Sequence, residues 1–205
     1  MKPFLISVIA LAALSAASLA RAESSTYSAD PNHTFITFEA KHFGTSTLRG
    51  RFDKKEGNVT IDRAAKTGKV DFTIDTTSIS TGVAQLDTHL KSKDFFNAAE
   101  APSAKFSGDK VSFDGNKVTS VAGSLTMLGK TLPVTLTASN FNCYESPMLK
   151  REVCGGDFET TIARSQWGMT YGVANGIPDN IRLLIQVEAV KQYAAGRPAG
   201  RYRRR

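Results

Sequence analysis

Hydrophobic and polar residues alternate along most of the chain from Tyr27 onward. In the first clear stretch, Ile36, Phe38, Ala40 and His42 share one face, and polar side chains occupy the other. The same period of two recurs, with turn-forming residues in between, over residues 48–52, 59–61, 70–74, 121–127, 132–136, 158–162 and 181–187. This pattern is typical of strands with one buried face, and it predicts an all-β antiparallel barrel or sandwich.

The segment 78–99 departs from this period. Its apolar residues recur at helical spacing, and Ser80 or Thr81 is placed to cap the first turn. The aromatic pair Phe95 and Phe96 follows, and Pro102 ends the segment. We therefore expect a single helical insertion that covers the mouth of a barrel, with its apolar side supplied by Val83, Leu86 and Leu90.

The first 22 residues have the pattern of a signal peptide. Lys2 precedes an apolar stretch over residues 4–19, and the small residues Ala20 and Ala22 flank Arg21, as signal peptidases require. A buried or anchoring helix is the alternative, but the stretch is short and diluted by Ala and Ser. We expect cleavage after Ala22 and export to the periplasm of a bacterium.

The chain has two cysteines, Cys143 and Cys154, which are eleven positions apart with turn residues around them. In an oxidising compartment such a pair favours a disulfide that closes a long hairpin loop. A closed zinc site needs four ligands, and no histidine is near the pair in the sequence. We therefore expect a structural disulfide and no metal site.

Charge is concentrated at the two ends of the chain. The whole sequence has 26 basic and 19 acidic residues. Two basic residues fall in the signal peptide and five arginines in the last nine positions, so that residues 23–196 have 19 of each sign and no net charge. This balance excludes a basic nucleic-acid-binding domain.

The sequence thus divides into a signal peptide at 1–22, a barrel at 23–193 and an Arg-rich tail at 194–205. The tail has Gly, Pro and charge without any apolar period, and we expect it to be disordered. Two interpretations of the tail remain open. It contacts an anionic membrane surface, or it is a solubilising segment without a fixed partner.

The three histidines, His33, His42 and His89, have no metal-binding spacing, and the sequence lacks nucleophile-elbow, phosphate-loop and dinucleotide motifs. We expect no cofactor. Asp87 and His89 are two apart, which on a helix points them in different directions and does not favour a catalytic dyad. His42 lies on an apolar face and is more typical of a core or rim histidine than of a ligand.

In the absence of catalytic or metal-binding motifs, the many apolar side chains are the main indication of function. The aromatic residues outnumber what a narrow barrel needs as filling. Gly50 and Gly123 fall on inward faces, where they either leave room for a ligand or mark strand bends. The sequence pattern does not separate these two interpretations.

A series of short motifs runs in order through nearly the whole exported chain. The most specific one contains Asp87, His89, Phe95 and Phe96, and the others lie at residues 27–42, 50–52, 101–106, 123–134 and 162–169. Together they resemble the YceI-like family of bacterial exported lipid-binding proteins. In that family an arginine usually precedes the Asp-x-His-Leu motif, whereas Leu86 stands here.

The resemblance implies an eight-stranded antiparallel lipocalin-like barrel with a helical segment across one opening. It also implies an elongated apolar cavity for a polyisoprenoid, a quinone or a related amphiphile, and no catalysis. On this basis we expect a polar rim of Asp87, His89 and Arg164. We expect the cavity lining to include Phe38, His42, Phe52, Phe72, Phe95, Phe96, Leu125 and Trp167.

Three hypotheses follow. The first is a non-catalytic periplasmic carrier for an isoprenoid or other long-chain lipid. The second is a stress-related interaction protein with a filled barrel and a basic tail that contacts a membrane or a partner. The third is an enzyme that acts on a bound lipid, with His42 or His89 as acid or base. A homodimer is compatible with each of them.

Overall fold

The computed structural model describes residues 24–193. The expected signal peptide, its cleavage site and the Arg-rich tail lie outside the described residues. Strands make up most of the described part, and within it no helix is long and apolar enough to cross a bilayer.

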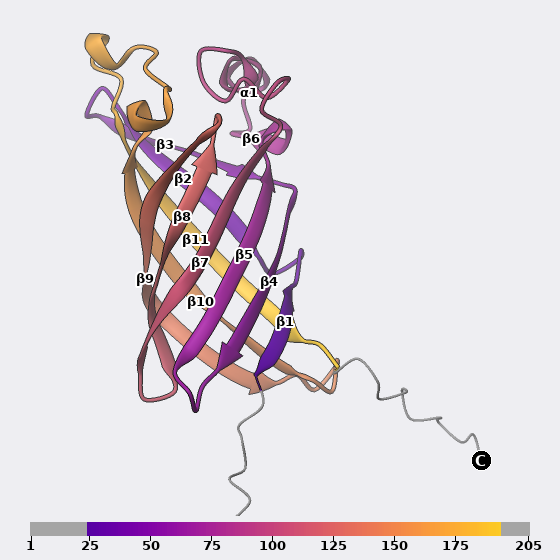
Figure 1. Cartoon of the computed structure of the whole chain (residues 1–205). Helices are drawn as coiled ribbons and strands as arrows, with labels where there is room; N and C mark the ends of the chain where they lie inside the picture. The colour runs from indigo at the N-terminus through magenta and orange to yellow at the C-terminus, as the bar shows by residue number, and fades with distance from the viewer. Residues whose placement is uncertain (1–23, 194–205) are drawn as a thin grey trace, which may run out of the picture.

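The long strands run along the molecule in Figure 1. The strand bounds are β1 Ser25–Ala29, β2 Phe35–His42, β3 Ser46–Phe52, β4 Lys55–Asp62, β5 Thr67–Asp75, β6 Ile79–Ser80, β7 Ser103–Asp114, β8 Lys117–Met127, β9 Lys130–Glu145, β10 Glu152–Ala163 and β11 Asn180–Lys191. Strands β1 and β6 are short and lie at opposite ends of the molecule. Helical segments connect the strands, and these are η1 Thr76–Ser78, α1 Ala84–Lys91, η2 Arg164–Trp167 and η3 Val173–Asn175.

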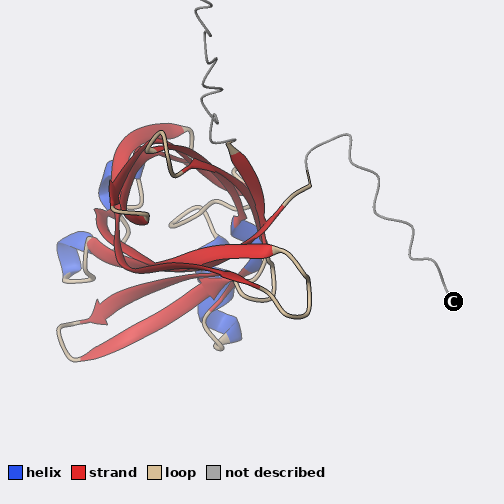
Figure 2. Ribbon diagram, turned by 90° about the horizontal axis from the view of Figure 1, so that it is seen from below, coloured by secondary structure: helices blue, strands red, loops and turns tan. Residues whose placement is uncertain are grey.

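The strands form one antiparallel sheet that closes on itself, as Figure 2 shows end-on. Its ring runs β1-β4-β5-β7-β8-β9-β10-β11 and returns to β1. Strands β2 and β3 pair with each other. Strand β1 pairs with residues 189–191 of β11 and β2 with residues 182–186, so β2 continues the path of β1 along β11, and β3 continues that of β4. The prediction of an eight-stranded antiparallel barrel is therefore confirmed.

The barrel has two different ends (Figure 1). One end, which we call the helical end, has α1, β6, η2, η3 and the β2–β3 turn. The opposite end, which we call the hairpin end, has the β4–β5, β7–β8 and β9–β10 turns, the start of β1 and the end of β11. The inward faces of the strands supply the core, and its largest fully buried side chains include Trp167, Tyr27 and Ile79.

The expected helix over 78–99 is wrong in its extent. The α-helix covers Ala84–Lys91 only, because residues 79 and 80 pair instead with β3, and residues 93–96 and 98–100 form turns. Gly82 separates the two elements with a positive φ of 80°, a conformation that glycine adopts without strain.

The expected capping residues are also wrong. Val83 occupies the N-cap position and makes no capping bond through its side chain. Thr81 instead donates its hydroxyl and its backbone N–H to the carboxylate of Asp87, at 2.6 and 2.7 Å. These bonds tie the first turn of α1 to the chain that enters it.

The disulfide between Cys143 and Cys154 is present as predicted. The two residues are direct partners in the β9–β10 pairing, with their Cα atoms 4.1 Å apart. The bond therefore joins two strands that are already paired, close to the hairpin end.

Removing this disulfide should destabilise the barrel moderately. We expect the Cys143→Ser/Cys154→Ser double variant to lose about 3 kcal/mol of unfolding free energy, because the denatured chain regains the entropy of an open loop. Urea unfolding of the oxidised protein and of the double variant measures the difference. Equal midpoints with equal slopes would contradict this expectation.

Candidate functional site

The barrel encloses two adjoining apolar chambers. The wide chamber lies at the helical end and has a volume of about 350 Å³. The narrow chamber lies toward the hairpin end and has a volume of about 120 Å³. Both chambers are lined in part by the same four aliphatic side chains, which we call the waist and which are Ile36, Ile74, Leu125 and Leu183.

The narrow chamber is lined almost wholly by hydrocarbon. Valine, isoleucine, leucine and phenylalanine side chains dominate it, and Phe72, Phe106, Phe141 and Phe158 supply its aromatic surface. The alternation along each strand accounts for this lining, since one face of every strand points into the barrel. Tyr27 and Cys154 also line this chamber, and they lie toward the hairpin end.

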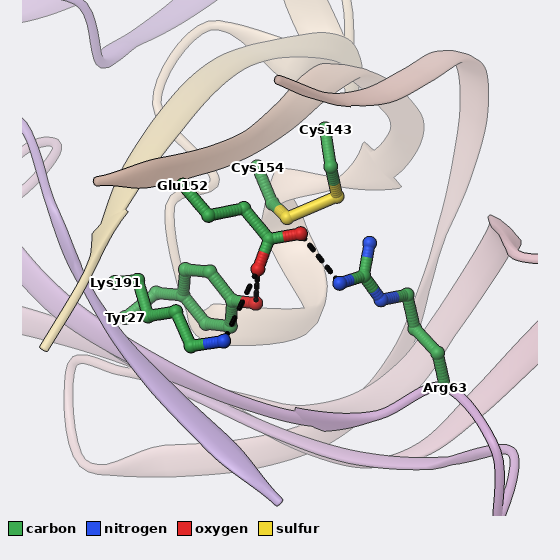
Figure 3. Close-up of a disulfide and its surroundings, with 6 residues drawn as sticks. All are labelled: Tyr27, Arg63, Cys143, Glu152, Cys154 and Lys191. Atoms are coloured by element: carbon green, nitrogen blue, oxygen red, sulfur yellow. Dashed lines mark hydrogen bonds and ion pairs between the residues drawn. A yellow bond between two sulfur atoms is a disulfide. The ribbon is translucent and has the colours of Figure 1, made fainter. Parts of the chain in front are cut away.

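A polar cluster lies beside the narrow chamber at the hairpin end (Figure 3). The carboxylate of Glu152 accepts a hydrogen bond of 2.8 Å from the Tyr27 hydroxyl and pairs with Arg63 at 2.5 Å and with Lys191 at 3.4 Å. These groups come from the loop after β4 and from β1, β10 and β11, so the cluster spans four consecutive strands of the ring. The carboxylate of Glu152 is thus bonded by all three partners.

The cluster shifts two pKa values. Burial, together with the bond to Glu152, raises the pKa of Tyr27 to about 12. Burial alone would raise the pKa of Glu152, but its bonds from Tyr27 and Arg63 hold that pKa below the ordinary value. The folded barrel therefore favours a neutral phenol beside a charged carboxylate.

This arrangement predicts a loss of stability in alkali. Because the pKa of Tyr27 rises from 10.0 to about 12 on folding, its contribution is complete below about pH 10 and is lost as the pH rises to about 12. The loss should approach about 2 kcal/mol. Urea unfolding measured across this range should show it, and Tyr27→Phe should flatten the curve. Parallel curves for the two proteins would contradict the assignment.

The wide chamber has polar groups in its wall, and Arg164 is the most buried of them, with 3% of its surface exposed. Its guanidinium donates to the carbonyl oxygens of Pro178, Met169 and Tyr171 at 2.9, 2.7 and 2.8 Å. It also lies over the ring of Phe95, at 5.4 Å from the centroid. Burial lowers the pKa of Arg164 from its usual value, and the nearby Asp179 opposes that shift.

An aromatic contact joins the two segments that cover the helical end. His89 of α1 packs edge-on against Phe95 at 5.1 Å and against Tyr171 of the η2–η3 loop at 4.8 Å. The Nε2 atom of His89 lies 3.2 Å from a carboxylate oxygen of Asp94. His89 therefore links α1 to the opposite loop across the wide chamber.

Most of the residues predicted to line a cavity face one of the chambers. Leu125 lies at the waist and Phe72 in the narrow chamber. The wide chamber is lined by Phe38, His42, Phe52, Phe95 and Phe96, and by the predicted rim residues His89 and Arg164.

Two of the predicted site residues are placed elsewhere. Trp167 lines neither chamber, because its buried indole packs in the core and donates to the backbone carbonyl of Leu125 at 3.1 Å. Asp87 is not at the cavity wall either, because its carboxylate is engaged by Thr81. Both residues support the walls of the site.

The two inward-facing glycines do not open the cavity. A Cβ atom at Gly50 would lie 2.3 Å from the ring of Phe38, and one at Gly123 would lie 2.3 Å from the backbone oxygen of Ser107. Gly50 therefore gives space to an aromatic ring of the cavity wall, and Gly123 to a neighbouring strand. The bend interpretation suits Gly123, which lies beside a register shift between β7 and β8.

Sequence reasoning missed several residues of the site. Tyr27 and Glu152 are more than a hundred positions apart, and no local pattern connects them. Met169, Tyr171, Ile177 and Pro178 line the wide chamber from a loop without any periodicity. Only the presence of large apolar side chains in that loop could have drawn attention to it.

Comparison with known proteins gives a consistent result. Residues 27–189 match the YceI-like domain. A UPF0312 protein of Pectobacterium atrosepticum is 33% identical over 193 residues, which cover 94% of this chain and 99% of the relative.

Solved structures share the fold. The Campylobacter jejuni YceI protein has a TM-score of 0.63 and 26% identity, over 75% of this chain and 90% of its own. A polyisoprenoid binding domain from Saccharophagus degradans, implicated in plant cell wall breakdown, has a TM-score of 0.58 and 16% identity. That match covers 81% of this chain and 98% of the domain, and it shows the fold alone.

Proposed function

We propose, from the premise that the chain belongs to the YceI-like family, that it binds and carries an amphiphilic lipid with one long chain inside its barrel. An isoprenoid or a quinone with an isoprenoid tail is the ligand class that fits best. The observation that carries the proposal is the pair of adjoining apolar chambers. The description of the Saccharophagus domain as polyisoprenoid binding agrees with it.

The shape of the cavity suggests how the ligand lies. The narrow chamber is lined by hydrocarbon and suits a single chain, whereas the wide chamber has room for a bulkier group. A chain of about fifteen buried carbons gains about 12 kcal/mol of gross transfer free energy. Ordering the chain offsets much of this gain, so a Kd between about micromolar and nanomolar is expected.

The polar group of the ligand would be recognised by side chains in the wall of the wide chamber. A guanidinium has five N–H groups, and three hydrogen bonds to backbone carbonyls leave Arg164 with donors to spare. A carbonyl or phosphate oxygen of the ligand would accept from them, with His89 and His42 in the same wall. The chain of the ligand would then point through the waist toward Tyr27.

The site favours binding over catalysis. His42 and His89 line a mainly apolar chamber. The described contacts of His89 are with Phe95, Tyr171 and Asp94, and none of these is a nucleophile such as serine or cysteine. The chambers also argue against the filled barrel of the interaction-protein hypothesis. Export to the periplasm is part of the proposal, and the signal-peptide pattern at 1–22 and the disulfide support it.

Native mass spectrometry of the protein purified from its own cells, followed by lipid extraction, tests the proposal. We expect one lipid with a long chain per barrel, or uptake of one lipid from an added set of prenols and quinones. A protein that stays free of lipid under both conditions would overturn it. The intact mass of the chain in the same spectrum tests cleavage after Ala22, because cleavage removes the mass of residues 1–22.

A further inference from the structure

The β9–β10 turn at the hairpin end exposes large apolar side chains. Met148 has 90% of its surface exposed, which is the highest value among the large hydrophobic residues described, and Leu149 has 44%. Tyr144 and Tyr193 are exposed at the same end, at 46% and 68%. Large apolar side chains that are exposed together on a protein surface often mark a site of contact with a protein or a membrane.

The turn is held in a defined conformation. The backbone N–H of Ser146 donates to the carbonyl of Arg151, and the N–H of Lys150 donates to the carbonyl of Ser146, both at 2.9 Å. The N–H of Leu149 donates to the hydroxyl oxygen of Ser146 at 3.2 Å. Cys143 lies two residues before Glu145 and Cys154 two residues after Glu152, so the disulfide joins the two strands next to the turn. Met148 and Leu149 are thus presented outward on a rigid base.

Cations outnumber carboxylates in the turns and strand ends of the hairpin end. The turns and strand ends of the hairpin end have the cations of residues 63, 66, 117, 150, 151 and 191 against the carboxylates of residues 62, 114, 145 and 152. Of these carboxylates, Glu152 is paired with Arg63 and Lys191.

The last twelve residues continue from this same end and add five arginines. Arg151 lies over the ring of Tyr193 at 5.5 Å and donates to the carbonyl of Lys191 at 3.4 Å. The described chain therefore ends beside the turn, at Tyr193.

We propose that the β9–β10 turn is a docking site for an anionic lipid bilayer. Met148 and Leu149 insert among the lipids, while Lys150 and Arg151 contact the phosphate headgroups. Apolar side chains combined with several cations give the two signals that stable surface binding requires. Tyrosine side chains suit the same interface.

Docking through this turn would fix the orientation of the barrel, and of its binding site, relative to the membrane. The wide chamber is lined by residues of the helical end, and that end is opposite to the β9–β10 turn (Figure 1). A docked barrel would therefore hold its binding site away from the membrane that anchors it. Docking itself does not depend on what the cavity binds, so the two proposals fail independently.

Sedimentation with vesicles tests the docking site. The purified protein should bind vesicles of phosphatidylcholine and phosphatidylglycerol in equal parts, and bind vesicles of phosphatidylcholine alone at least about tenfold more weakly. Met148→Ser/Leu149→Ser should weaken binding to the anionic vesicles at least about tenfold. A Met148→Trp variant should show a blue shift of its fluorescence with the same vesicles.

Val83→Ser is the matched control, because Val83 is also exposed, at 56%, but lies at the helical end. It should bind the vesicles as the unchanged protein does. Equal binding by the Met148→Ser/Leu149→Ser variant would overturn the role of the turn. Equal binding to both kinds of vesicle, or binding to neither, would overturn the proposal as a whole.

Discussion

Leu183→Trp is expected to weaken lipid binding about hundredfold while the barrel stays folded. Leu183 lies at the waist, where it lines both chambers, so a larger side chain would block the path between them. A ligand excluded from the narrow chamber loses the burial of about four methylene groups at about 0.8 kcal/mol each. Titration with a fluorescent prenol or quinone measures the change in Kd.

Leu184→Trp is the matched control on the same strand. Successive side chains of β11 point to opposite faces of the sheet, and Leu184 lines neither chamber. Its substitution should leave the Kd unchanged. If both variants bind as the unchanged protein does, the ligand does not pass the waist and the orientation proposed above is wrong. If both bind equally poorly, the effect comes from the fold and not from the cavity.

The strands could be predicted from the sequence because each has one face in the core. Ile36 and Phe38, which alternate with polar neighbours, face the chambers as the period of two requires. The same reasoning failed at residues 79–80, where apolar spacing suggested a helix. Pairing with β3 and the positive φ at Gly82 outweigh local helical preference there, and neither is visible in a local pattern.

The candidate site could be predicted only in part, for a similar reason. Side chains that line the chambers from strands follow from alternation and from the family resemblance. The role of Arg164 does not, because its three acceptors come from a loop whose path depends on the arginine itself. The resemblance predicts Trp167 in the cavity lining, but the indole N–H needs a buried acceptor and finds one at the carbonyl of Leu125.

Arg164→Met is expected to lower the free energy of unfolding by about 4 kcal/mol. Methionine has a similar length but no donors, so the carbonyls of Pro178, Met169 and Tyr171 lose their partner. Each lost bond to a charged donor costs about 1.5–3 kcal/mol, less what the protein regains by no longer burying the charge. A decrease in Tm of about 8–16 °C should follow for a domain of this size.

Arg182→Met provides the comparison, because Arg182 is an exposed arginine whose ion pairs with Glu39 and Glu159 lie on the outside of the barrel. Exposed pairs of this kind contribute little to stability, so its Tm should hardly move. Arg164→Met should also make the amides of residues 169–178 exchange faster with solvent, since the loop loses its anchor. A Tm equal to that of the unchanged protein, with unaltered exchange in this loop, would show that the guanidinium does not hold the wall. The role of Arg164 would then be limited to binding the ligand.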